Sequence, residues 1–221
     1  MPDQPVTVIG GAGISQRDLM QCLKRSSKLI SADGGTNYLI GKGIVPNLII
    51  GDLDSLSNKV FWKDCGAKLV RITEQETTDF EKCIYSCNAL YYLCLGFVGR
   101  RTDHFLSVCS TLVKFGNKGL IVIGSHDIIL HIPKSIELVL PLGTRVSLFP
   151  MKCLIGVSSR GLKWPISGIK FDPSTFVGIS NRTSKNVVNV EISDFGMLMI
   201  LPRGCLNAVF NYLSERYCQT K

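Results

Sequence analysis

Short β-type runs alternate with helical patterns over residues 5–124, and this alternation is the strongest constraint on the fold. Strand and helix in alternation form βαβ units, which build a parallel sheet with helices on both faces. Thr78 followed by Glu81 has the form of a capping box, which predicts a helix start at that point. The expected strands of this part are Val6–Ile9, Lys28–Ser31, Leu48–Ile50, Lys68–Ile72, Tyr91–Val98 and Leu120–Ile123.

After residue 125 the pattern changes to short β-rich segments separated by Gly, Pro and Asn, which predicts an antiparallel β-sandwich or barrel. The expected strands are Ile128–Ile132, Ile136–Leu140, Arg145–Phe149, Leu154–Ser158, Val187–Ile192 and Met197–Leu201. Cys205–Tyr217 has the spacing of an amphipathic helix. We therefore expect an α/β chain with a parallel-sheet, Rossmann-like domain (1–125), an antiparallel β domain (126–203) and a C-terminal helix (204–221).

The composition is that of a globular protein, with 221 residues, of which 45% are hydrophobic and 19% charged. Its nine cysteines are odd in number and form no C-x-x-C pair, which favours buried, reduced thiols and a cytoplasmic location. Neither a secretory signal nor a transmembrane segment is expected, so no membrane partner is predicted. The net charge of +8 is spread along the chain, so nucleic acid is not expected as a partner either.

Three acidic segments each lie at a probable strand end or helix start. They are Ser31-Ala32-Asp33-Gly34-Gly35, Gly51-Asp52-Leu53-Asp54-Ser55 and Thr77-Thr78-Asp79-Phe80-Glu81-Lys82. Carboxylates gathered at one edge of a parallel sheet repel one another unless a cation lies between them, and a divalent metal is the usual solution. If Asp52 and Asp54 continue an extended strand, both side chains point the same way and can face one Mg²⁺ ion.

Each of these motifs also has a purely structural interpretation. Asp54 or Ser55 could simply cap the next helix, and Asp79 with Lys82 could form an ion pair on a solvated face. Gly99-Arg100-Arg101-Thr102-Asp103-His104 offers arginines for phosphate, or a helix N-cap with surface arginines. Trp164 could stack on a flat cationic ligand or belong to a core or an interface, whereas Trp62 lies in a helical pattern and is expected in the core.

The motifs A-D-G-G, P-x-L-I-I-G-D-x-D-S, T-T-D-F-x-K-C, G-R-x-D-H, G-L-K-W and G-x-S-N, in this order, resemble those of the thiamin pyrophosphokinase family. The resemblance extends from about Val6 to Leu201. It implies an enzyme that transfers the pyrophosphoryl group of ATP to the hydroxyethyl group of thiamine, giving thiamine diphosphate and AMP. It also implies Mg²⁺ as the cofactor, an α/β domain followed by a β domain, and a homodimer with active sites between subunits.

Residue by residue, the resemblance implies that Asp52, Asp54 and Asp79 hold Mg²⁺, with Asp33 lining the same site. The ATP and phosphate contacts implied are Asp33, Lys82, Arg101, Asp103, Ser180 and Asn181, and the thiamine contacts are Trp164 and Gln75. Asp54, Asp79 and Arg101 are the expected catalytic residues, and Asp54 and Asp79 remain alternatives for the group that accepts the hydroxyl proton.

Two positions depart from the family pattern. Arg100 stands where members often have a second glycine, and Glu76 where they frequently have aspartate. Both departures leave open a regulator of the same fold that binds nucleotide or thiamine with little or no turnover. A further alternative is an enzyme of the same pyrophosphoryl-transfer chemistry that acts on a different hydroxymethylated heterocycle.

Overall fold

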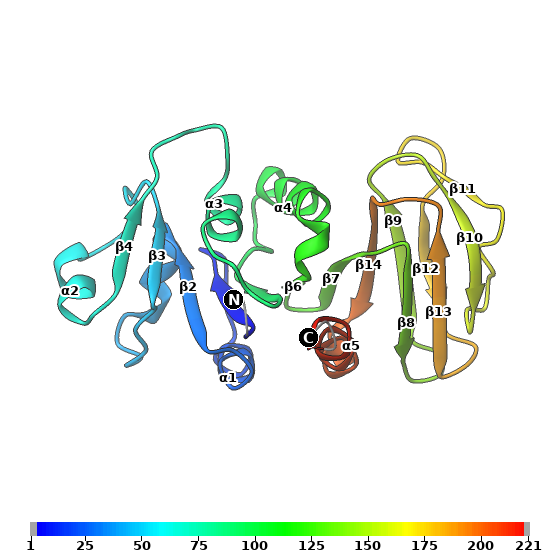
Figure 1. Cartoon of the computed structure of the whole chain (residues 1–221), viewed down its shortest axis with the longest axis horizontal. Coiled ribbons are helices and arrows are strands. Elements are labelled where there is room, and N and C mark those ends of the chain that lie inside the picture. The colour runs from blue at the N-terminus through cyan, green and yellow to red at the C-terminus, as the bar shows by residue number, and fades with distance from the viewer. Residues whose placement is uncertain (1–3, 219–221) are drawn as a thin grey trace. The chain divides into compact units, whose positions relative to one another are not determined.

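The computed structural model describes residues 4–218, so the outermost residues of the predicted first and last domains lie outside the described part (Figure 1). The chain divides into two compact units. One comprises residues 1–111 and 122–125, and the other residues 112–121 and 126–221. β6 (Leu120–Ile123) and α4 (Thr102–Lys114) contribute residues to both. Among the described residues, no helix has both the length and the apolar character needed to cross a membrane.

The first unit contains a parallel sheet in which the strand order is β5-β1-β2-β3-β4. The strands are β1 (Val6–Ile9), β2 (Lys28–Ala32), β3 (Leu48–Gly51), β4 (Lys68–Arg71) and β5 (Tyr92–Leu95). Every residue of β1 and β5 is buried, as expected for parallel strands that are covered on both faces. The helices are α1 (Gln16–Leu23), α2 (Lys59–Asp64), α3 (Asp79–Tyr85) and α4.

The start of α3 is the one that the sequence predicts. Thr78 is its N-cap, and the Thr78 hydroxyl accepts a hydrogen bond from the backbone N–H of Glu81 at 3.3 Å. α3 packs on β2 and β3, which places its first turn beside the carboxyl ends of those strands. Ligands of open α/β sheets bind at that edge, so a ligand site is expected at the loops that follow β1, β2, β3 and β5.

The second unit contains two antiparallel sheets. In one the order is β7 (Asp127–Ile132), β14 (Met197–Pro202), β9 (Arg145–Pro150), β12 (Gly178–Arg182). In the other it is β11 (Lys170–Phe171), β10 (Leu154–Arg160), β13 (Val187–Ile192), β8 (Ser135–Val139). Buried and exposed residues alternate along β8, as in a sheet with one face on a core. The expected C-terminal helix is α5 (Leu206–Cys218), which packs on β8.

The expected α/β fold with a following antiparallel β domain is confirmed, with three local differences. The predicted strand Tyr91–Val98 ends at Leu95, because Gly96 turns the chain with a φ of +74°. β11 and β12 were not expected, since β11 has two residues and β12 contains a register shift where Ser180 has a φ of +61°.

Trp62 is fully buried, as predicted for a core residue. The eight cysteines whose side chains are described are all free thiols.

Candidate active site

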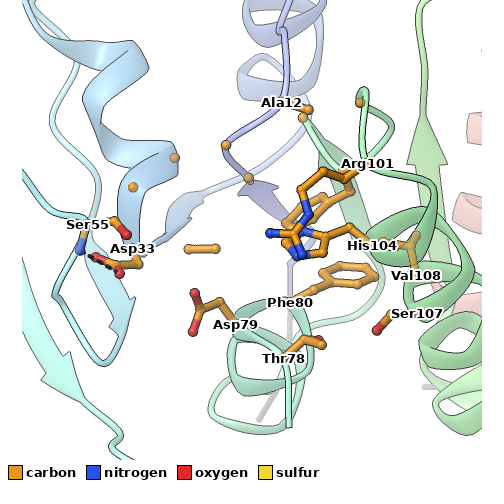
Figure 2. A pocket seen from close by; sticks show the side chains of 18 of the residues that line it. Ala12, Asp33, Ser55, Thr78, Asp79, Phe80, Arg101, His104, Ser107 and Val108 are labelled. Atoms are coloured by element: carbon orange, nitrogen blue, oxygen red, sulfur yellow. Dashed lines mark hydrogen bonds between the residues drawn. The ribbon is translucent and has the colours of Figure 1, made fainter. Parts of the chain in front are cut away.

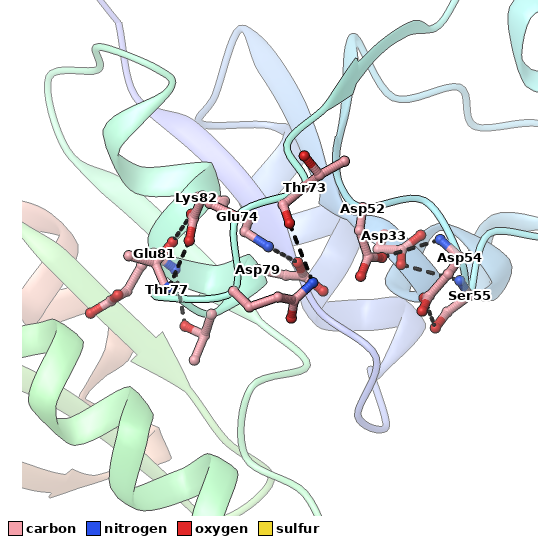
Figure 3. A network of polar contacts seen from close by, with 12 residues as sticks. Asp33, Asp52, Asp54, Ser55, Thr73, Glu74, Thr77, Asp79, Glu81 and Lys82 are labelled. Atoms are coloured by element: carbon pink, nitrogen blue, oxygen red, sulfur yellow. Dashed lines mark hydrogen bonds and ion pairs between the residues drawn. The ribbon is translucent and has the colours of Figure 1, made fainter.

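Three carboxylates meet at the carboxyl edge of the parallel sheet. Asp33 follows β2, and Asp52 and Asp54 follow β3. One oxygen from each lies within 4.8 Å of the others, which is the spacing of a donor set for a divalent cation (Figure 3). Asp79 is not a member of this group. The sequence therefore predicted two of the three clustered carboxylates as metal ligands and placed Asp33 only in the surroundings.

Asp52 and Asp54 come together through a turn, not along an extended strand. β3 ends at Gly51, and Leu53 adopts a left-handed backbone conformation with a φ of +65° while its side chain is buried. The Asp52 carboxylate accepts a hydrogen bond from the backbone N–H of Asp54 at 3.2 Å. The expected strand geometry was therefore wrong. The capping alternative for Asp54 and Ser55 is wrong as well, because α2 has Asn58 as its N-cap.

Asp33 is a buried carboxylate that the surrounding protein leaves partly unsatisfied. Its side chain is 2% exposed, and its Oδ2 accepts a hydrogen bond from the backbone N–H of Ser55 at 3.2 Å. Its Oδ1 has no hydrogen-bond partner among the described residues. Burial, together with the negative charges of Asp79 and Asp52, raises the pKa of Asp33 to about 6. An unpaired buried carboxylate oxygen beside two other carboxylates fits a bound Mg²⁺ ion.

Asp79 borders this cluster across Gly51. A Cβ atom built on Gly51 would lie 2.7 Å from Cβ of Asp33 and 3.3 Å from Oδ1 of Asp79, so only glycine leaves room for both side chains. Asp79 is the first residue of α3, and its Oδ1 lies 3.5 Å from the Nζ atom of Lys82. The two residues thus form the i,i+3 ion pair of the structural interpretation. The pair does not lie on a fully solvated face, because the Lys82 side chain is only 3% exposed, whereas that of Asp79 is 41% exposed.

A cavity of about 430 Å³ opens beside these carboxylates within the first unit. Backbone of the glycines that follow β1, β2 and β5 forms much of its wall, and the rings of Phe80 and Phe97 lie 4.1 Å apart. Asp33 and Asp79 lie on one side of the cavity, and Arg101 and His104 lie on the other (Figure 2). The cavity thus combines a surface on which a flat ring can rest, backbone amides and charges of both signs.

The two neighbouring arginines that line this cavity differ in their partners. Arg101 donates from Nε to Oδ1 of Asp103 at 3.2 Å and from Nη2 to Oδ2 at 2.6 Å, and both side chains are exposed. The hydrogen bond from Arg101 lowers the pKa of Asp103 to about 2. The prediction that Asp103 supports Arg101 agrees with this contact. Within the described part of the chain, Arg100 makes no hydrogen bond or ion pair, so its charge is available to a ligand.

The loop between β4 and α3 contains a residue that the sequence analysis missed. Glu74 accepts hydrogen bonds from its own loop and from Tyr85 at the end of α3. The only signal in the sequence was a carboxylate two residues from Glu76, which is too common a pattern to single out a residue. Gln75, an expected thiamine contact, is exposed in the same loop, and its Nε2 lies 3.5 Å from the carbonyl oxygen of Thr73.

The predicted residues of the second unit lie together around Trp164. The Trp164 side chain is 51% exposed, so the core interpretation is wrong, and the Nζ atom of Lys163 lies 4.7 Å from the ring centroid. The amide of Asn181 accepts from the backbone N–H of Trp164 at 3.2 Å and donates to its carbonyl oxygen at 2.7 Å. Asn181 therefore fixes the backbone of Trp164, while Ser180 is exposed beside it.

Comparisons with known proteins agree with this two-part organisation. Residues 19–123 match the family model "Thiamin pyrophosphokinase, catalytic domain", and residues 127–194 match "Thiamin pyrophosphokinase, vitamin B1 binding domain". Thiamine pyrophosphokinase 1 of Oryza sativa subsp. japonica is 26% identical over 168 residues, which are 66% of this chain and 62% of that protein. Thiamine pyrophosphokinase 3 of the same plant is 24% identical over 206 residues, covering 75% of each.

Solved structures show the same fold. Thiamin pyrophosphokinase from Candida albicans superposes with a TM-score of 0.80 at 21% identity, covering 90% of this chain and 89% of that one. The yeast thiamin pyrophosphokinase superposes with a TM-score of 0.79 at 21% identity, covering 91% and 87%. Because the two family models together match well over half of its residues, the protein belongs to the thiamin pyrophosphokinase family.

Proposed function

We propose that this protein transfers the pyrophosphoryl group of ATP to the hydroxyethyl group of thiamine, forming thiamine diphosphate and AMP. The observation that carries the proposal is the group of Asp33, Asp52 and Asp54 at the edge of a glycine-lined cavity, in a chain that matches both domain models of this family. In the proposed reaction a bond forms between the thiamine hydroxyl oxygen and the β-phosphorus, and the bond from that phosphorus to the oxygen of AMP breaks.

The metal in this proposal is Mg²⁺, held by Asp52 and Asp54 as the sequence predicts, and also by Asp33. When bound, Mg²⁺ supplies positive charge that neutralises the polyphosphate. Asp79 faces the same space without belonging to the closest donor group, which suits it to accept the hydroxyl proton of thiamine. Asp54 is the alternative acceptor, but its proposed role as a metal ligand makes it the less suitable base.

For ATP, we propose the cavity of the first unit. Arg101, held by Asp103, is proposed to bind the phosphate chain, and Arg100 is proposed to add a second cation there. Buried Lys82 is proposed to add positive charge next to Asp79. Such a reaction depends mainly on positioning and charge neutralisation, because no covalent intermediate with the protein is required. Contact of Ser180 and Asn181 with the nucleotide stays a prediction.

For thiamine, the proposed contacts are Trp164 and Gln75. Trp164 lies within the residues that match the vitamin B1 binding domain, and its exposed ring can stack on a cationic heterocycle. The proposal also includes a homodimer with active sites between subunits and a cytoplasmic location, both taken from the sequence analysis.

The test is AMP release from MgATP with and without thiamine, followed by mass detection of the product. We expect AMP only when thiamine is present, and loss of this signal in Asp54→Asn. A protein that binds ATP or thiamine tightly in a calorimeter but releases no AMP would instead be the regulator. AMP release with another hydroxylated heterocycle and none with thiamine would identify a different acceptor.

A further inference from the structure

The Glu74 carboxylate accepts four hydrogen bonds, three from the loop between β4 and α3 and one from Tyr85 in α3. Glu74 and Thr77 are labelled in Figure 3. Its Oε2 accepts from the backbone N–H groups of Glu76 at 2.7 Å and Thr77 at 2.9 Å. Its Oε1 accepts from the hydroxyl of Thr77 and from the hydroxyl of Tyr85, the latter at 2.9 Å. Hydrogen bonds to an ionised carboxylate are stronger than neutral ones, so this carboxylate holds the loop in one conformation.

These contacts fix both the internal conformation of the loop and its attachment to α3. Those to Glu76 and Thr77 close a turn around the carboxylate, and the one to Tyr85 ties the turn to the last residue of α3. Thr78 immediately continues the loop as the N-cap of α3. The orientation of the loop is therefore coupled to α3 at both ends of the helix.

Most side chains of this loop are exposed, so hydrophobic packing does not explain why the conformation of the loop is fixed. Thr73, Gln75 and Glu76 are all exposed, and Glu74 is half-buried. Purely structural loops on a protein surface tolerate motion and variation, whereas functional loops need fixed side chains. The four hydrogen bonds to Glu74, in a loop that buries few side chains, therefore indicate that the function requires this loop to keep a fixed conformation.

The residues that the loop places are those nearest the proposed reaction. The loop begins beside the metal-binding cluster, because the backbone N–H of Ile72, the residue after β4, donates to the carbonyl oxygen of Gly51 at 2.8 Å, directly before Asp52. At its other end the loop leads into Asp79, which borders Asp33 across Gly51. Both ends of the loop thus reach the carboxylates.

We propose that Glu74 is a positioning residue that, together with Tyr85, fixes the β4–α3 loop so that Asp79 faces the group formed by Asp33, Asp52 and Asp54. This inference rests on the proposed function for its catalytic consequence. Its structural part concerns the metal-binding cluster alone, so it can be measured without turnover.

The test compares Glu74→Gln and Tyr85→Phe with a matched control. In Glu74→Gln the single amide oxygen can accept from the backbone N–H groups of Glu76 and Thr77 while the NH₂ faces the two hydroxyls, but every hydrogen bond loses the carboxylate charge, which weakens the turn. Tyr85→Phe removes one of the four hydrogen bonds. Asp172→Asn is the control, because Asp172 also closes its own surface turn, accepting from the backbone N–H of Ser174 at 2.8 Å, but lies in the second unit.

Two readouts are measured on the full chain, namely the Mn²⁺ dissociation constant from a titration without substrates, and kcat and KM for thiamine at saturating MgATP. Since misplacement of catalytic groups by about 1 Å can cost about 100-fold in rate, we expect Glu74→Gln to lower kcat at least about 10-fold. We expect the same variant to weaken Mn²⁺ binding, Tyr85→Phe to give a smaller change of the same kind, and Asp172→Asn to leave both readouts unchanged.

Unchanged Mn²⁺ affinity and unchanged kcat in a folded Glu74→Gln protein would overturn the inference. Equal losses in Glu74→Gln and Asp172→Asn would also overturn it, because they would reflect general destabilisation. If the wild-type protein forms no thiamine diphosphate, the proposed function fails, and the Mn²⁺ titration alone decides whether Glu74 positions the cluster.

Discussion

The Asp52 carboxylate accepts a hydrogen bond from the backbone N–H of Asp54 at 3.2 Å, across a left-handed Leu53. The buried Leu53 side chain anchors the turn, and the two carboxylates stand on either side of it. A left-handed conformation of a non-glycine residue costs about 1–3 kcal/mol and persists at sites where the surrounding structure requires it. This turn brings both carboxylates to the position where Asp33 meets them.

Asp54→Asn should lower kcat by at least about 100-fold, because it removes one negative charge from the proposed metal site and weakens charge neutralisation in the transition state. Steady-state kinetics checks the loss, and circular dichroism checks that the variant is folded. Asp64→Asn, on the exposed end of α2, is the control and should retain activity. Full activity in Asp54→Asn would contradict the metal site.

Gly51→Ala should weaken Mn²⁺ binding, because the new Cβ atom would lie 2.7 Å from Cβ of Asp33 and 3.3 Å from Oδ1 of Asp79. Gly13→Ala is the matched control, since a Cβ atom added at Gly13 would lie more than 4 Å from every described residue except its two chain neighbours. A metal titration that gives the same dissociation constant for both variants would show that the spacing of Asp33 and Asp79 does not matter for the site.

Arg100→Ala should raise KM for ATP about 10-fold, because Arg100 lines the cavity, has no carboxylate partner among residues 4–218 and can therefore bind phosphate. The increase should shrink at high ionic strength, where exposed charges are screened. Initial rates as a function of ATP concentration at two salt concentrations measure both effects. A KM that is unchanged at low salt would remove Arg100 from the phosphate site.

Trp164→Ala should raise KM for thiamine, because stacking on the exposed ring is lost. Lys163→Met should act in the opposite direction and lower it, since the Lys163 ammonium lies 4.7 Å from the centroid of the ring on which a cationic ligand would stack. Thiamine titrations of the two variants provide the comparison. If KM for thiamine stays the same in Trp164→Ala, the stacking proposal is wrong.

His131 should make the stability of the protein depend on pH. Burial lowers the pKa of His131 from its ordinary value of 6.5, and its Nε2 accepts from the backbone N–H of Gly196 at 3.1 Å, which requires the neutral ring. The unfolded chain therefore takes up a proton more readily. The stabilising effect of the neutral ring is complete above pH 6.5 and declines as the pH falls from there towards the lowered pKa of the folded state, by at most about 1.4 kcal/mol per pH unit.

Urea unfolding between pH 5 and pH 8 measures this dependence. His131→Leu should remove this contribution and also lower the stability at neutral pH, because the N–H of Gly196 loses its acceptor. His126→Gln, at an exposed position, should keep the dependence of the wild type. The His131 contribution is the difference in stability between the wild type and His131→Leu. If this difference grew as the pH fell below 6.5, the neutral buried ring would be contradicted.

The fold could be predicted because the apolar residues of the chain recur with the periods of helices and strands. Buried parallel strands such as β5 are continuous apolar runs in the sequence, and the Thr78 cap marks the start of α3. β12 escaped prediction because a bulge at Ser180 breaks the alternation that identifies a strand.

The sequence predicted which residues form the site and that they follow strand ends, but it did not predict how their side chains are arranged. Sequence could not show that Leu53 turns through a left-handed conformation, or that the buried carboxylate of Asp33 joins Asp52 and Asp54. Such details depend on tertiary contacts between strands that are distant in the sequence. The role of Glu74 depends in the same way on Tyr85, eleven residues further along the chain.

The most direct test of the proposed reaction is to quantify AMP and thiamine diphosphate in the same quenched samples of protein, MgATP and thiamine. Transfer of both terminal phosphoryl groups in one step predicts equal amounts of the two products at every time point. Formation of ADP with thiamine monophosphate, or of AMP without thiamine diphosphate, would contradict pyrophosphoryl transfer by this protein.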